Sequence, residues 1–241
     1  PDSGLANIKA EGGPNGLKKK LDLANELSSG FLSKYNDANV TAYQEFYDNT
    51  LRMLRSEDLN AFDLTKESKR MRERYGNNKF GQGCLLARRL SEAGIRFIEV
   101  TSDGWDMHQD IKGDMDDVSP SFDQGFAALI GDLKERGMLD STLVVMATEF
   151  GRKPSYTGKG RGHYPSCFTV GLAGAGVKRG FVYGASDKEG RHPDKPVTIG
   201  DFHATIGHAA GLPRETPAKT SSGRPFHIGG EDANVITEMF S

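Results

Sequence analysis

Carboxylate, imidazole and guanidinium side chains gather in two short stretches of the sequence. The first reads DGWDMHQD and contains Asp106 and His108; the second follows TLVVMAT and contains Glu149, Arg152 and His163. Carboxylate oxygens and imidazole nitrogens can hold a divalent cation, which polarises an ester oxygen or lowers the pKa of a bound water. An arginine beside them offers a planar fork of N–H donors for sulfate or phosphate oxygens. These residue types therefore predict one joint site for a metal and an anionic ester.

Each stretch directly follows a segment with the composition of a buried strand. IRFIEV, at residues 95–100, precedes the first, and TLVVMAT, at residues 142–148, precedes the second. Helical patterns alternate with such segments over short connections, which favours an α/β fold with a mainly parallel sheet and helices on both faces. In such open sheets, ligands bind beyond the carboxyl ends of the strands. The two stretches are therefore expected to meet at one edge of the sheet.

Apolar periodicity and end signals place two helices between these segments. The sequence GQGCLLARRLSEAG predicts the first, which Gly94 ends in the position after the C-cap. Its apolar face is expected to hold Leu86, Leu90 and Ala93. The second is predicted to open at Ser119-Pro120, with serine as cap and proline in the first turn, and to close at Gly137. Its apolar face is expected to hold Phe122, Phe126, Leu129, Ile130 and Leu133.

A third helix is predicted after Thr198, where the sequence TIGD has the form of a capping box. Asp201 could be a metal ligand, but its place in the first helical turn favours a structural role. His203 lies on the same helix and is the first of the remaining histidines to test. Trp105, the only tryptophan, is interpreted as a packing anchor for its loop, with substrate stacking as the alternative.

Composition excludes several classes of protein. The 241 residues carry a formal net charge of −2, which argues against a general nucleic-acid binder. The longest apolar run is far below the ~18 residues of a membrane span. Two cysteines, Cys84 and Cys167, are too few for a disulfide framework or a zinc knuckle and are expected to be unpaired. Because Pro1 is not a natural start, we expect that a leader was removed or that the chain is a fragment.

Three regions are expected along the chain. Residues 1–16 are turn-rich and predict a loop or arm. Residues 17–78 are charged and helix-prone, and predict a helical segment packed on the core. Residues 79–241 then form the α/β domain. A helical stripe in the middle region comprises Tyr43, Phe46, Tyr47, Leu51 and Leu54.

With these residues in hand, the chain resembles the C-terminal part of a bacterial family, domain-of-unknown-function family 1501. The matching stretches are GCLLARRLSEAGIRFIEV, GWDMHQD, LDSTLVVMATEFGRKP, GRGHYP, LAGAGVKRGFVYGASDKEG, PVTIGDFHATIGHAAGLP and GRPFHIGG. They occur in order over about residues 60–240. The family is sulfatase-like and is grouped with the alkaline-phosphatase superfamily.

This resemblance implies a three-layer α/β/α sandwich carrying a metal-assisted hydrolytic site for sulfate or phosphate esters. It implies that Asp106, His108, Glu149 and His163 hold a divalent cation (Ca, Zn, Mg or Mn), and that Arg152 binds the ester anion. Arg152 and His163 would then be the catalytic pair. Phe150 stands where the superfamily has a second ligand, which weakens a two-metal site.

The resemblance also implies a missing N-terminal half, a cellular location and a class of substrate. Superfamily members take their nucleophile from an N-terminal half, so that half is expected from the same precursor. Export, or a periplasmic location, is suggested by the resemblance alone. A sulfated glycan is one candidate among anionic ester substrates.

Two other functions remain open at this stage. The first is a catalytically inactive sulfatase-like module for glycan binding or assembly. The second is a metal-dependent phosphodiesterase acting on nucleotides, because fold alone cannot choose among superfamily substrates.

Overall fold

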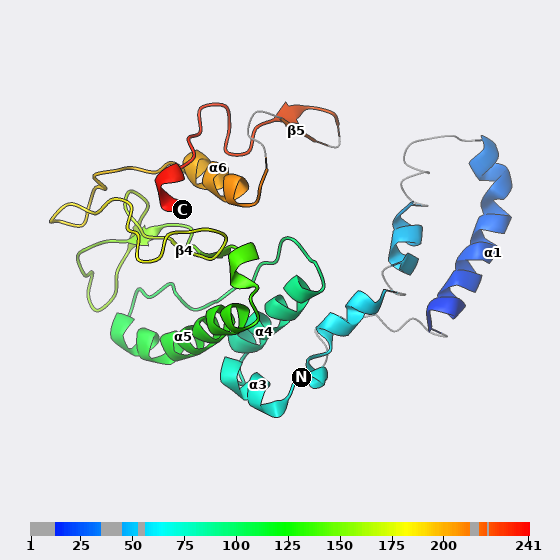
Figure 1. The fold of residues 1–241 in the computed structure, drawn as a ribbon, viewed down its shortest axis with the longest axis horizontal. Helices are drawn as coiled ribbons and strands as arrows, with labels where there is room; N and C mark the ends of the chain where they lie inside the picture. The colour runs from blue at the N-terminus through cyan, green and yellow to red at the C-terminus, as the bar shows by residue number, and fades with distance from the viewer. Residues whose placement is uncertain (1–12, 35–44, 53–55, 213–216, 221) are drawn as a thin grey trace. The chain divides into compact units, whose positions relative to one another are not determined.

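The structure is a computed structural model. It describes all residues except 1–12, 35–44, 53–55, 213–216 and 221 (Figure 1). The chain divides into two compact units, Pro1–Thr101 and Ser102–Ser241. Most of the predicted arm lies outside the described residues, as do Tyr43 and Leu54 of the predicted stripe. No helix in the described ranges is both long and apolar enough to cross a membrane.

The first unit is helical wherever it has regular structure. Its elements are α1 (Gly13–Lys34), helical residues 45–52, η1 (Glu57–Phe62), η2 (Leu64–Lys66), α3 (Lys69–Tyr75) and α4 (Lys79–Glu92). The Asn78 side chain caps α4 by accepting from Gly81 N–H at 2.8 Å. Gly81 is required there, because a Cβ would lie 1.9 Å from the Tyr75 carbonyl oxygen. That close approach fixes α3 against α4.

The buried face of α4 differs from the predicted one. Helix α4 buries Gly81, Cys84, Leu85 and Arg88, whereas Leu86 and Leu90 are half-buried. The prediction considered apolar spacing alone. Arg88 can be buried because its guanidinium pairs with Glu67 at 2.9 Å and with Glu92 at 2.6 Å. A charged residue therefore occupies the centre of this face.

Residues 95–100 do not form the predicted strand. They follow Gly94, which ends α4 with φ +85° as predicted, but they take part in no strand pairing. A strand is defined by a hydrogen-bonded neighbour, and this segment has none in the described part of the chain. Phe97 is 82% exposed, so the apolar composition of IRFIEV does not reflect burial here.

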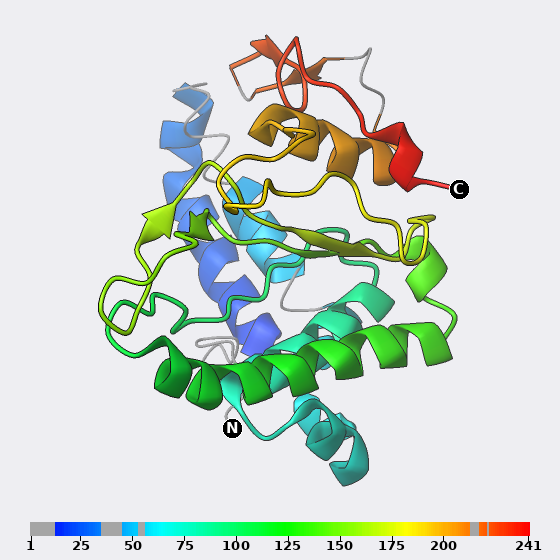
Figure 2. The ribbon, with the colours of Figure 1, turned by 90° about the vertical axis from the view of Figure 1, so that its left-hand side faces the viewer.

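The second unit has helices on either side of a short strand pair. Its elements are α5 (Ile111–Glu135), η3 (Leu139–Ser141), β1 (Val144–Met146), β2 (Gly151–Arg152), β3 (His163–Tyr164), β4 (Gly171–Ala173), α6 (Ile199–Ala209), β5 (Ala218–Lys219), β6 (Pro225–Phe226) and η4 (Thr237–Met239). Both ribbon views place the β1–β4 pair between α5 and α6 (Figures 1 and 2). Helix and strand are thus mixed in this unit, as an α/β prediction requires.

The predicted parallel three-layer sandwich is nevertheless wrong. The strand pairs in the described residues are β1–β4, β2–β3 and β5–β6, and all three are antiparallel. A parallel pair needs a long crossover, usually through a helix. The connection from β1 to β4 instead contains the β2–β3 pair. Short antiparallel ribbons therefore replace the predicted sheet.

Helix α5 begins earlier than its sequence signals predicted. Asp110 is its N-cap and accepts from Gly113 N–H, so Pro120 lies inside the helix rather than in its first turn. Ser119 Oγ, predicted to be the cap, donates to the Met115 carbonyl at 2.6 Å. The nine helical residues before Pro120 were missed because the prediction took this proline as a first-turn residue, whereas it lies inside the helix, where it cannot donate a backbone hydrogen bond. The predicted end at Gly137 is confirmed by its φ of +70°.

The capping box of α6 is confirmed. Thr198 Oγ1 accepts from Asp201 N–H at 3.0 Å, and the Asp201 carboxylate accepts from Thr198 N–H at 2.9 Å. Asp201 also accepts from Asn234 N–H at 2.6 Å. These contacts hold the C-terminal segment against the start of α6.

Candidate functional site

The loop before α5 presents Asp106 and His108 to solvent. Met107, between them, is buried, with 5% of its surface exposed. Trp105 anchors the loop: its indole Nε1 donates to Ser102 Oγ at 2.9 Å, and its ring meets the edge of the Phe122 ring, with centroids 5.4 Å apart. These two contacts support the predicted packing role of Trp105. Trp105 and Met107 fix the loop by packing, whereas Asp106 and His108 remain exposed to solvent.

Arg152 and His163 are brought together by strand pairing. In the antiparallel β2–β3 pair, Arg152 lies directly opposite His163. Directly opposite residues project their side chains to the same face of a ribbon. Gly151 allows the close approach of this ribbon to the following segment, because a Cβ there would lie 2.3 Å from the Cys167 carbonyl oxygen.

Main-chain hydrogen bonds join this hairpin to the loop before α5. Ile111 N–H donates to the Lys159 carbonyl, and Arg161 N–H donates to the Met107 carbonyl, both at 3.1 Å. Gly160 lies between these two bonds and is buried. A Cβ at Gly160 would lie 2.1 Å from the His108 carbonyl oxygen. The two loops therefore meet backbone to backbone, which sets the distance between their side chains.

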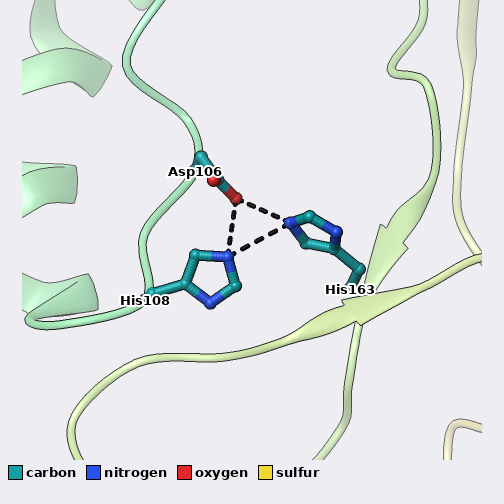
Figure 3. Close-up of side chains that lie close together, drawn as sticks. All are labelled: Asp106, His108 and His163. Atoms are coloured by element: carbon teal, nitrogen blue, oxygen red, sulfur yellow. Dashed lines mark hydrogen bonds and ion pairs between the residues drawn. The ribbon is translucent and has the colours of Figure 1, made fainter.

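Three ligand atoms converge at this junction (Figure 3). Asp106 Oδ1 lies 2.9 Å from His163 Nε2 and 3.0 Å from His108 Nε2. The two histidine Nε2 atoms are 3.1 Å apart. We call Asp106, His108 and His163 the cluster. Its side chains are about half exposed, so a ligand can reach them from solvent.

The charge on the cluster is set by Arg152. Its Nη1 donates to Asp106 Oδ1, and its guanidinium lies 5.5 Å from the centre of the Phe150 ring. The Arg152 hydrogen bond, with smaller contributions from His163 and His108, lowers the pKa of Asp106 to about 2. Asp106 is therefore an anion at neutral pH, as a metal ligand must be.

The cluster fits a divalent cation. Ligand-to-metal bonds of about 2.0–2.2 Å in a tetrahedral site separate neighbouring ligand atoms by roughly 3.4 Å. The three observed separations fall a few tenths of an ångström short of that value, so small side-chain rotations suffice. Two imidazole nitrogens and one carboxylate oxygen suit zinc and other first-row transition metals better than calcium or magnesium, which prefer all-oxygen sites.

Glu149, the fourth predicted ligand, lies outside the group of converging atoms. Its Oε1 is 3.8 Å from Arg152 Nη2, so it approaches the cluster only through that arginine. The sequence placed Glu149 beside the site because it follows a strand directly. A bend at residues 149–150 turns the chain before β2 begins and directs this carboxylate to the guanidinium.

Other residues considered from the sequence have different surroundings. Asp201 holds the start of α6, and the N–H of Asn234, then the hydroxyl and N–H of Thr198, lower its pKa. His203 is exposed on α6 with its ring near Phe202. Phe150 was singled out from the sequence only as the replacement of a second metal ligand, and its ring centroid lies 4.4 Å from that of His163. The contact of Phe150 with His163 could have been suspected from the sequence, because Phe150 lies between Glu149 and Arg152, which were both predicted site residues.

The family model described as "Protein of unknown function (DUF1501)" matches residues 5–240. The chain belongs to this family. Searches of curated proteins and of solved structures found no match. All residues of the cluster, and Arg152 beside it, fall within the part of the chain that the DUF1501 model matches. The predicted family is therefore confirmed.

Proposed function

We propose that this DUF1501 chain contributes a metal-dependent site for the hydrolysis of sulfate or phosphate esters. The observation that carries the proposal is the convergence of Asp106 Oδ1 and two histidine Nε2 atoms within 3.1 Å of one another. The sulfatase-like character of the family, proposed from its motifs, agrees with this chemistry.

Asp106, His108 and His163 would hold the metal, with zinc favoured by the donor set. A divalent cation bound there would polarise an ester oxygen and lower the pKa of a water molecule. His163 is the member of the cluster that also faces an aromatic ring, Phe150, which shields one side of its imidazole. Glu149 remains a proposed fourth ligand that would have to turn from Arg152 towards the cluster.

Arg152 would bind the ester anion. A guanidinium has five N–H donors, and the contact with Asp106 uses Nη1. The remaining donors can form the paired hydrogen bonds that sulfate and phosphate oxygens accept. Arg152 is also part of the wall of a large cleft, so an anion can approach it from that side. Metal and arginine would then hold the two sides of one ester group.

A non-catalytic binding module is the second candidate, and Phe150 favours it. An apolar ring packs against the imidazole of His163 at the position where a second metal ligand was expected. A site with one metal can still bind a sulfate or phosphate group. It would then serve recognition rather than turnover.

Calorimetric titration of the full chain with zinc tests the site. The double variant Asp106→Ala/His163→Ala should lose at least ~100-fold in affinity, since even an outer-shell partner typically costs 10–100-fold. A matched control is Asp117→Ala/His192→Ala, which removes an exposed aspartate and an exposed histidine elsewhere in the second unit. Equal zinc affinity in the cluster variant and the wild type would reject the ligand assignment.

Turnover separates the two candidate functions. The zinc-loaded full-length protein, including the N-terminal half that is expected to supply the nucleophile, should hydrolyse 4-nitrophenyl sulfate or 4-nitrophenyl phosphate, and chelation should abolish the reaction. Zinc binding that depends on the cluster, with no turnover of either ester, would favour the binding module.

A further inference from the structure

The second unit has a wide cleft that includes Arg152 in its wall but none of the three cluster residues. Its volume is about 2000 Å³, and its walls are formed by the end of α5, residues 165–170, strand β4, residues 174–198 and the start of α6. Sites for small molecules usually enclose about 300–1,000 Å³. The cleft is therefore larger than a single ester group needs, and it has room for several units of a longer ligand.

The side chains that line the cleft are strongly biased towards positive charge. Seven of them are lysine or arginine, against two carboxylates, Asp140 and Glu189. The whole chain, by contrast, has a formal net charge of −2. A concave surface lined by one sign of charge focuses its field and attracts ligands of the opposite sign. Charge complementarity thus indicates an anionic ligand with several charges.

Several of these cations are available to a ligand. Lys134, Arg179 and Lys188 are exposed and form no ion pair with any residue that the structure describes. Arg161 also lines the cleft, and its Nε is shielded from solvent without a hydrogen-bond partner in the described part of the chain. A ligand in the cleft would therefore be met by the exposed cations and not by this shielded nitrogen.

Two lysines in the cleft lie over aromatic rings. Lys178 Nζ is 5.9 Å from the centre of the Phe181 ring, and Lys195 Nζ is 5.1 Å from that of Tyr183. Single-stranded nucleic acids bind largely by stacking bases on such ring faces. Here an ammonium group covers a face of each ring, so the rings position charge instead of offering a platform for bases.

We infer that the cleft binds an anionic polysaccharide along a series of lysine and arginine side chains. Arg152 belongs both to the cleft wall and to the surroundings of the cluster. A chain lying in the cleft would therefore bring one of its anionic groups to Arg152 while other groups meet Arg179 and Lys188. This placement of an ester group rests on the proposed function; binding in the cleft does not.

Binding of heparin oligosaccharides of increasing length to the full chain tests the inference. Measuring in excess chelator removes any contribution from a metal. Affinity should rise with oligosaccharide length and fall with added salt, because several charges are neutralised together. The variant Arg179→Gln/Lys188→Gln should bind about tenfold more weakly. A matched control is Lys219→Gln/Arg224→Gln, which removes two exposed cations outside the cleft.

Three outcomes would overturn the inference: no binding by the wild-type chain, an equal loss in the cleft and control variants, or tighter binding of a single-stranded oligonucleotide of matched charge. The last would assign the cleft to nucleic acid. Circular dichroism of each variant checks that the fold is kept. If the protein binds the polysaccharide but does not hydrolyse 4-nitrophenyl esters, the proposed hydrolysis is rejected and the inference about the cleft is unaffected.

Discussion

Each unit of the chain contains an arginine that pairs with carboxylates, and the two groups differ in exposure. In the first unit, Arg88 is 1% exposed and pairs with Glu67, which is 13% exposed. In the second unit, Arg152 is 23% exposed and pairs with Asp106, which is 64% exposed. The first group is closed off from solvent. The second is open and includes two histidines whose ring nitrogens face the same carboxylate oxygen.

The difference separates a structural ion pair from a candidate binding site. Burying Arg88 is tolerated only because two carboxylates compensate its charge. Asp106 needs no such compensation, because water would solvate it; its neighbours nevertheless converge on it. The exposed group therefore remains accessible to a ligand, whereas the buried guanidinium is paired within the fold.

The largest expected effect is on the buried group. Arg88→Ala should lower the free energy of unfolding by about 2–5 kcal/mol, because it removes a fully buried long side chain and its packing, although Glu67 keeps its ion pair with Arg89 at 2.7 Å. Arg88→Met should cost less, because it keeps most of the packing volume. Urea denaturation of the full chain measures both. Equal losses in the two variants would show that charge, and not volume, dominates at this position.

The two cysteines extend the comparison to reactivity. Burial raises the pKa of Cys84, in the first unit, to about 12, which lowers its thiolate fraction roughly a thousandfold relative to a free thiol. Cys167, in the second unit, is only half-buried. A thiol reagent such as Ellman's reagent should label one cysteine of the folded chain, and Cys167→Ser should abolish that reaction. Rapid labelling of two thiols in the native state would contradict the burial of Cys84.

A smaller effect is expected at the start of α6. Asp201→Ala should cost about 1 kcal/mol, because it removes the N3 acceptor of the capping box and the acceptor for the Asn234 N–H, while Asp201→Asn keeps an acceptor and should cost less. The pKa of Asp201 is lowered in the folded chain. Its stabilisation is therefore present above the ordinary aspartate pKa of 3.8 and is lost as the pH falls through the lowered pKa. Thermal denaturation of wild type and variant between pH 7 and pH 3 should show the difference shrinking with acid.

The smallest effect on stability is expected at the exposed group. Arg152→Ala should change the free energy of unfolding by about 0–1 kcal/mol, as for other exposed pairs. It should also raise the pKa of Asp106 from about 2 towards its ordinary value, because the first cause of the lowering is removed. Carboxyl carbon NMR titration measures that change. A destabilisation as large as that of Arg88→Ala would erase the distinction between the two groups.

Local signals in the sequence were sufficient where a few neighbouring residues decide the structure. The capping box of α6 depends on Thr198 and Asp201 alone, and it formed as predicted. The end of α5 depends on Gly137, whose positive φ has little cost without a side chain. The start of α5 failed because Asp110 and Pro120 give competing signals for the same helix.

Sheet topology could not be predicted in the same way. The apolar composition of residues 142–148 located β1, but nothing in that segment specifies whether its partner runs parallel or antiparallel. The partner, β4, lies more than twenty residues further along the chain. Residues 95–100 have a similar composition and no partner in the described structure. Strand pairing depends on distant segments, and a local pattern does not contain it.

The candidate site was predicted in part. Residue types and their position after predicted strands selected Asp106, His108, Arg152 and His163, which the structure brings together. That assignment was made on a parallel sheet that does not exist. What joins the two loops is the β2–β3 register and the contact at Gly160, neither of which has a recognisable signal in one sequence. Glu149 also follows a predicted strand, but a bend at residues 149–150 directs its carboxylate to Arg152 and not to the cluster.

The contact at Gly160 makes the cluster vulnerable at a position that holds no ligand. A methyl group there would collide with the main chain of His108 and push one histidine away from the other. Lengthening either loop by one residue would shift the hydrogen bonds on both sides of the glycine and separate the same atoms. The affinity that we propose for a cation at this site would thus depend on loop length and on the lack of a side chain at Gly160, as well as on the groups that would touch the ion.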